Sequence, residues 1–192
     1  MAVDTRTVIR DVSTSLKTLL KANVPELYDD NFISFGSPSD IDSTNICLSM
    51  CLYYLTESPS MRNSEKEPIA GTNQFYDPPS YLDLYYLMTP YAKDRDTELL
   101  ILGKIFQIFH EHAILSGDDL KGNLIACGNE GIRISYNNLS LQDIKQLWEV
   151  FPGKPAKLSL SYLVSPVRLP AEKIITIPRV LERDLGVHQI KY

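Results

Sequence analysis

Residues 46–56 read ICLSMCLYYLT, and this alternation of side chains decides how the rest of the chain is interpreted. One face would carry Ile46, Leu48, Met50, Leu52 and Tyr54, and the other Cys47, Ser49, Cys51 and Tyr53. A period of two is typical of a strand with one buried face, and tyrosine and isoleucine favour strands. We therefore predict a strand here, with a helix as the alternative.

A second strand is predicted over residues 81–88, YLDLYYLM, and Thr89-Pro90 should end it because proline cannot donate to a ladder. Residues 58–80 join the two strands and contain four prolines and few apolar side chains. The pattern indicates a hairpin with a long loop at its tip. Connections of this length are usually functional or disordered.

Helical periodicity marks three further segments, residues 8–22, 98–113 and 140–150. Ser140 with Asp143 three residues later forms a capping-box pattern at the start of the third.

Strands are predicted over 32–36, 132–136 and 157–165, and the last of these should point Leu158, Leu160, Tyr162 and Val164 inward. Ile174, Ile175 and Ile177 predict one edge strand after Pro170.

Together these elements predict an α/β fold of the α+β type. We expect a mostly antiparallel sheet of four or five strands, packed on one face by helices 8–22 and 98–113, with helix 140–150 covering an end. Residues 1–168 should form a single domain that includes the long loop 58–80, and residues 169–192 a C-terminal arm.

The helix over residues 98–113 is apolar on two sides. Ile101, Leu102, Ile105, Ile108 and Phe109 form one apolar face, and Leu99, Leu100, Phe106 and Ala113 add a second. A helix with this pattern is buried on more than one side. Either it crosses a core between the sheet and the first helix, or its second face meets a partner protein.

Composition argues against several classes of function. The net charge of −5 is unfavourable for binding nucleic acid, whose phosphates attract basic surfaces. The chain starts without a signal-peptide pattern, and the apolar stretch 99–115 is too polar for a membrane span, so we expect a protein made in the cytoplasm. On one strand, Cys47 and Cys51 would be about 13 Å apart, too far for a disulfide.

Catalytic and metal-binding patterns are weak. Residues 117–123 have P-loop glycine spacing but lack the Lys and Ser/Thr that hold phosphate and Mg²⁺. On a helix His110 and His112 point in nearly opposite directions and cannot share an ion, and Asp118-Asp119 lack further calcium ligands. We expect no cofactor, no metal and no enzymatic activity. A small hydrolase using Asp118, Asp119 and His110 is a distant alternative.

The succession of segments is more specific than any motif. It comprises VIRDVS (8–13), LYYL (52–55), PSMRN (59–63), YLDLYYLMTPYA (81–92), ELLILGK (98–104) and LSLSY (158–162). This succession resembles the tail-terminator, or cap, proteins of extracellular contractile injection systems of the Photorhabdus virulence cassette and antifeeding prophage type. The resemblance covers roughly residues 6–170 and fades after Arg168.

The resemblance implies a function in a particle built in the bacterial cytoplasm and then released or membrane-anchored. Six copies would form a ring on the inner tube, end its polymerisation and hold the last sheath layer, without a cofactor. The partners would be other copies, the tube protein and the sheath protein. A baseplate or tube-initiating subunit is the alternative. Exposure and charge suggest as contact residues Arg62, Asn63, Tyr91, Lys93, Arg95, Phe106, Arg168 and Arg179.

Overall fold

A computed structural model describes residues 4–41, 47–62, 64–151 and 153–176. Its main feature is a six-stranded sheet of order β1-β2-β5-β8-β7-β6, antiparallel except for the β1–β2 pair. The strands are β1 (Ile33–Ser34), β2 (Cys47–Glu57), β5 (Ser80–Tyr91), β6 (Ile114–Ser116), β7 (Gly131–Tyr136) and β8 (Leu160–Leu169). The predicted hairpin of residues 46–56 and 81–88 is therefore confirmed, as β2 and β5.

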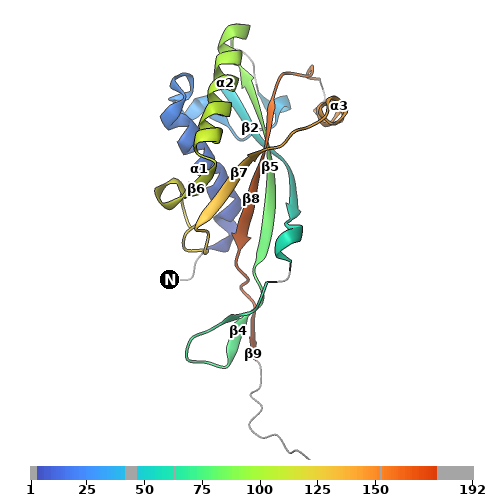
Figure 1. Cartoon of the computed structure of the whole chain (residues 1–192). Helices are drawn as coiled ribbons and strands as arrows, with labels where there is room; N and C mark the ends of the chain where they lie inside the picture. Colours follow the sequence, from blue (N-terminus) through green and yellow to red (C-terminus); the bar gives the residue numbers. More distant parts are fainter. Residues whose placement is uncertain (1–3, 42–46, 63, 152, 177–192) are drawn as a thin grey trace, which may run out of the picture.

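Two long helices cover one face of this sheet (Figure 1). They are α1 (Val8–Asn23) and α2 (Arg95–Glu111), and both contribute to the main core together with Leu48, Met50 and Val164. The short 3-10 helices are η1 (Thr5–Thr7), η2 (Pro25–Leu27), η3 (Asp30–Phe32), η4 (Pro38–Asp40), η5 (Pro59–Met61) and η6 (Gly117–Asp119). The predicted α+β class with two helices on one face is confirmed.

The third helix, α3 (Leu141–Glu149), lies on the other face of the sheet (Figure 1). The capping box holds as predicted, because Ser140 Oγ accepts from the Asp143 N–H and the Asp143 carboxylate accepts from the Ser140 N–H. Trp148 and Phe151 pack on Leu87 and form a second small core. Helix α3 therefore covers part of a face, where we expected it to cover an end.

The long loop is more ordered than predicted. Residues 58–80 contain β3 (Glu67–Pro68) and β4 (Gln74–Tyr76), and β4 also pairs with β9 (Ile174–Thr176) in a three-stranded sheet. This small sheet projects from the main body at the foot of the molecule (Figure 1). Strand β9 matches the predicted edge strand as far as Thr176, whereas Ile177 lies outside the described residues.

Three local predictions need correction. An extra residue in β2 at Tyr53 shifts the register between Leu52 and Tyr54, so Tyr54 turns to the α3 side of the sheet. Strand β5 runs past Pro90, although we expected Thr89-Pro90 to end it. Its pairing with β8 ends at Met88, so β5 is an edge strand on that side beyond Met88, and an edge position tolerates a residue without an N–H. Leu158 precedes β8 and is exposed.

Strand β8 also continues beyond the predicted end at Ser165. Its register with β5 shifts between the pairs Leu82–Val167 and Leu84–Val164, which leaves Pro166 in a bulge where no ladder N–H is needed. The sheet has six strands rather than four or five because β6 was not predicted. Within the described ranges, no helix has the length and apolar character needed to cross a bilayer.

Candidate interaction surface

Helix α2 exposes a row of apolar side chains away from the core. Asp94 caps the helix by accepting from the Thr97 N–H at 2.8 Å, and Ile101 and Ile105 are buried beneath it. On the other side Leu99, Leu100 and Phe106 are 46%, 63% and 50% exposed. A hollow of about 540 Å³ there is lined by Asp96, Leu99, Leu100, Gly103 and Lys104. These five residues and Phe106 are called the α2 outer face below.

The α2 outer face distinguishes between the two interpretations of this helix, a core crossing and a partner-binding face. The helix does not cross a core, because its second apolar side faces solvent in the described structure. Phe106 packs edge-on against Tyr136 of β7 at 5.7 Å, and Tyr136 in turn meets the buried Tyr162 at 5.6 Å. An aromatic chain thus links the surface at Phe106 to the core. Such a pre-ordered apolar surface suits a protein partner.

A second apolar region lies on the opposite face of the sheet. Tyr54 contacts Tyr85 with ring centroids 5.3 Å apart, and Tyr53 lies beside them at 6.2 Å from Tyr85. A hollow of about 380 Å³ between these tyrosines and α3 is lined by Tyr53, Tyr54, Tyr85, Asn137, Leu139, Asp143, Gln146 and Leu147. Leu141 on α3 is 87% exposed. We call this region the α3 face.

The predicted contact residues after β5 differ in accessibility. Lys93 is exposed and Arg95 is half-exposed and paired with Glu98, whereas Tyr91 is buried, with its hydroxyl directed to the Pro38 carbonyl at 3.3 Å. Burial raises the pKa of Tyr91 to about 12. The Lys157 Nζ lies 4.4 Å from its ring centroid and also pairs with Glu98. Only Lys93 and Arg95 are therefore open to a partner here.

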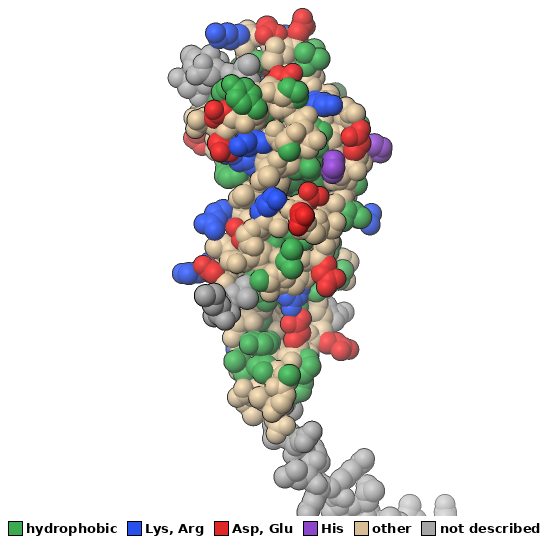
Figure 2. Space-filling view, turned by 90° about the vertical axis from the view of Figure 1, so that its left-hand side faces the viewer, with side chains coloured by type: hydrophobic (Ala, Val, Ile, Leu, Met, Phe, Trp, Pro, Cys, Tyr) green, Lys and Arg blue, Asp and Glu red, His purple; other side chains and the backbone are tan. Residues whose placement is uncertain are grey.

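Glu98 organises the start of α2. Burial alone would raise the pKa of this carboxyl group, but hydrogen bonds from Lys157 and Arg95 lower it overall. On the face shown in Figure 2, acidic and basic side chains are interspersed along the body, and apolar side chains gather near the foot over the small sheet.

Arg168 has partners within the chain. Its guanidinium donates to both carboxylate oxygens of Glu67, at 2.5 and 2.6 Å, and to the Cys127 carbonyl. Its backbone exchanges hydrogen bonds with the side chain of Asn129. Arg168 therefore ties the small sheet and the loop before β7 to β8. Exposed Arg62 faces Glu57 at 3.5 Å, and Asn63 and Arg179 lie outside the described residues.

The glycine-rich loop after β6 is a structural anchor. The buried carboxylate of Asp11 on α1 accepts from the Asn123 N–H at 2.9 Å and from the Thr7 hydroxyl at 2.7 Å. Gly122 has φ +63° and approaches so closely that a Cβ would overlap this carboxylate. This docking explains why residue 122 is a glycine, whereas a Cβ at Gly117 would meet nothing within 4 Å. Sequence reasoning missed Asp11, since nothing along the chain links it to residue 122.

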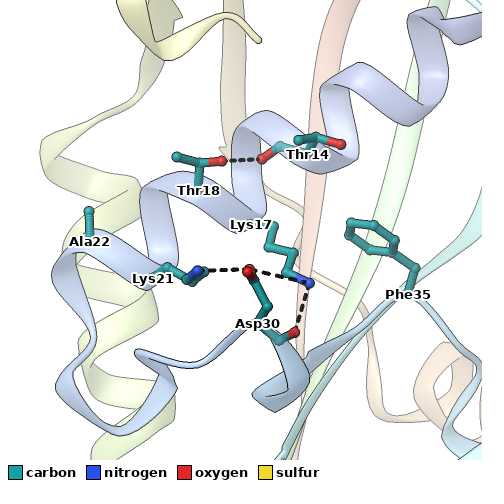
Figure 3. A pocket seen from close by; sticks show the side chains of 7 residues that line it. All are labelled: Thr14, Lys17, Thr18, Lys21, Ala22, Asp30 and Phe35. Atoms are coloured by element: carbon teal, nitrogen blue, oxygen red, sulfur yellow. Dashed lines mark hydrogen bonds and ion pairs between the residues drawn. The ribbon is translucent and has the colours of Figure 1, made fainter. Parts of the chain in front are cut away.

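A hollow of about 480 Å³ lies beside α1, lined by Thr14, Lys17, Thr18, Lys21, Ala22, Asp30 and Phe35 (Figure 3). Its two lysines already have partners. Lys21 Nζ lies 2.7 Å from the Asp30 carboxylate, and Lys17 donates to the carbonyls of Asp30 and Ile33. The lysines therefore hold η3 and β1 against α1.

The described residues contain no group of three or more His, Cys, Asp or Glu side chains that could hold a metal ion. No hydrogen bond joins His110 to Asp118 or Asp119 within the described ranges. Cys47, Cys51 and Cys127 are free thiols, and burial raises the pKa of each. Raised thiol pKa values are unfavourable for nucleophilic catalysis.

Comparisons with known proteins give a family for this chain and two solved structures of similar fold. The Pvc16 N-terminal domain family matches residues 11–183. The sheath/tube terminator of the extracellular contractile injection system PVC, in its extended state, has a similar fold, with a TM-score of 0.68 and 19% identity over 95% of this chain and 64% of that one. The tube-terminating cap of the anti-feeding prophage gives 0.64 and 16%, over 92% and 60%. No curated protein sequence matches. This chain thus spans less than two thirds of either relative's length.

Proposed function

Because this chain belongs to the Pvc16 N-terminal domain family, we propose that it is the terminator domain of a phage-tail-like contractile injection particle. In this proposal six copies form a ring on the end of the inner tube. The ring stops tube and sheath polymerisation and holds the last sheath layer in its extended state. Its action is steric and adhesive and requires no catalytic group or cofactor.

The observation that carries the proposal is the pair of apolar regions on opposite faces of one sheet. The α2 outer face lies on one side and the α3 face on the other. A head-to-tail contact between two different surfaces generates a closed ring when the rotation between neighbours closes. This arrangement supports a ring in which the α2 outer face of one copy meets the α3 face of the next.

The remaining surfaces are assigned to tube and sheath. The small sheet projects from the body at the foot, and Arg62 lies on the same connection between β2 and β5. Lys93 and Arg95 lie at the other end, where α2 begins. We assign residues 1–168 to the terminator domain and residues 169–192 to an arm that reaches a neighbouring subunit. Arg179 belongs to that arm, and Arg168 anchors its base.

Electron microscopy of particles from cells that lack the gene tests the proposal. Loss should give particles of widely varying length with open ends, and the intact gene should restore one length and a closed end. Matched variants then test the surfaces. Leu141→Lys on the α3 face should fail to restore closed ends, whereas Ile125→Lys, an exposed residue on the loop before β7, should restore them.

Particles that keep a single length and a closed end without the gene would refute the terminator assignment. Absence of all particles without the gene would instead favour a baseplate or tube-initiating role, because loss of such a subunit abolishes particles instead of altering their length. Gold labelling of a tagged chain separates these roles independently, since a terminator labels the end distal to the baseplate.

A further inference from the structure

The α2 outer face carries a charge pattern that complements itself. Asp96 lies near the start of the helix and Lys104 lies eight residues later, with Leu99, Leu100 and Gly103 between them. In the described part of the chain Asp96 has no ion-pair partner, and Lys104 makes one hydrogen bond, to Gln107 at 3.2 Å. When two such helices pack antiparallel, Asp96 of each copy lies on the same side as Lys104 of the other.

Gly103 is a second notable feature of this face, because nothing in the part of the chain that the structure describes requires a glycine there. It lies within α2 without a positive φ, and a Cβ added to it would meet no atom within 4 Å. A glycine inside a helix costs about 0.5–1 kcal/mol relative to alanine. Its missing side chain leaves open space beside Leu100 in the hollow that both residues line.

We propose that two copies of this chain pair through their α2 outer faces, antiparallel across a two-fold axis between residues 101 and 102. With a rise of about 1.5 Å per residue, Leu100 of each copy is then level with Gly103 of the other. Asp96 lies about 4.5 Å along the axis from Lys104 of the second copy, within reach of a lysine side chain. Leu100 of each copy thus fills the space beside Gly103 of the other, and the Asp96–Lys104 pair forms twice across the two-fold axis.

This dimer goes beyond the terminator function and does not rest on it. The ring proposed above uses the same face against a different surface, so one protomer makes only one of the two contacts at a time. Isolated protein would therefore be held as dimers, which open when a tube end offers the competing contact. In the ring, the α2 outer face meets a different surface, so Asp96 of one copy does not lie beside Lys104 of another. Exchanging these two charges therefore distinguishes the dimer from the ring.

Sedimentation velocity of the purified chain tests the pairing. Asp96→Lys and Lys104→Asp should each weaken the dimer about tenfold or more, because each change places like charges together twice. The double variant Asp96→Lys/Lys104→Asp should regain affinity close to wild type, because it exchanges the charges. A monomer at every concentration, or a double variant no tighter than the single variants, would overturn the proposal.

Disulfide trapping provides a second readout. In this arrangement the two Leu100 Cα atoms are about 5.5–7 Å apart, a separation that a disulfide can bridge. Leu100→Cys should therefore give a covalent dimer under mild oxidation, whereas wild type and Leu141→Cys, exposed on α3, should not. Equal cross-linking of Leu100→Cys and Leu141→Cys would contradict the two-fold axis on α2. Circular dichroism of each variant checks that the fold is retained.

Discussion

Replacing Gly122 by alanine should destabilise the protein far more than the same change at Gly117, five residues earlier. Both glycines have positive φ, +63° and +54°, so alanine costs about 1–2 kcal/mol at either position. Only Gly122 contacts another element, since a Cβ there overlaps the Asp11 carboxylate, whereas a Cβ at Gly117 meets nothing within 4 Å. The two variants therefore separate backbone strain from loss of the loop anchor.

The additional loss follows from the hydrogen bonds of Asp11. Its carboxylate would have to move away from the Asn123 N–H and the Thr7 hydroxyl, and a hydrogen bond to a charged group contributes about 1.5–3 kcal/mol. With the backbone strain and the loss of one of these two hydrogen bonds, we expect Gly122→Ala to lower the free energy of unfolding by about 2.5–5 kcal/mol, and Gly117→Ala by about 1–2 kcal/mol.

Urea denaturation followed by circular dichroism measures both losses. A double-mutant cycle sharpens the test, because in an Asp11→Ala background the Gly122→Ala change should cost only the backbone strain of about 1–2 kcal/mol. Equal losses for the two glycine variants, within about 0.5 kcal/mol, would refute the reasoning.

Three further predictions concern other contacts. Burial raises the pKa of Tyr86 to about 12. The stabilisation that the protonated Tyr86 hydroxyl contributes is thus complete below pH ~10 and is lost as the pH rises from ~10 to ~12. Over this interval the free energy of unfolding should fall by about 3 kcal/mol less in Tyr86→Phe than in the wild type. Arg168→Met should speed hydrogen exchange of residues 64–77, whereas Arg62→Met, which removes the exposed pair with Glu57, should not. Ser140→Ala should cost about 1 kcal/mol and speed amide exchange in α3 first, and unchanged exchange there would contradict a role for the cap.

The sequence predicts those elements whose periodicity is long and uninterrupted. Helix α1 was predicted to end at Ala22 and ends at Asn23. The capping box of α3 was recognised because all its partners lie within four residues. Strand β6 was missed because three residues with a single buried side chain, Leu115, show too little alternation to distinguish them from a loop.

Errors in side-chain direction have one physical origin, the pairing of distant strands. The bulge at Tyr53 depends on how β2 meets β5, and it reverses the face of every residue that follows. The strand β8 crosses Pro166 for a similar reason, since its bulge against β5 removes the need for an N–H. Neither feature has a local signal, because the deciding partner lies about 30 or 80 residues away along the chain.

Charge in the sequence was also a poor guide to which residues are free to contact a partner. Arg168, Lys157, Lys17 and Lys21 are all basic, but each is paired within the chain, so basic character does not identify a residue that meets a partner. Phe106 was selected because it lies on the second apolar side of a helix, and that side does face solvent. Burying apolar area stabilises association without requiring a particular charge, by about 25 cal/mol per Å². Exposed apolar faces are therefore better guides to candidate contact surfaces of this chain than its basic residues, and in the proposed dimer the charges at Asp96 and Lys104 set how two such faces align.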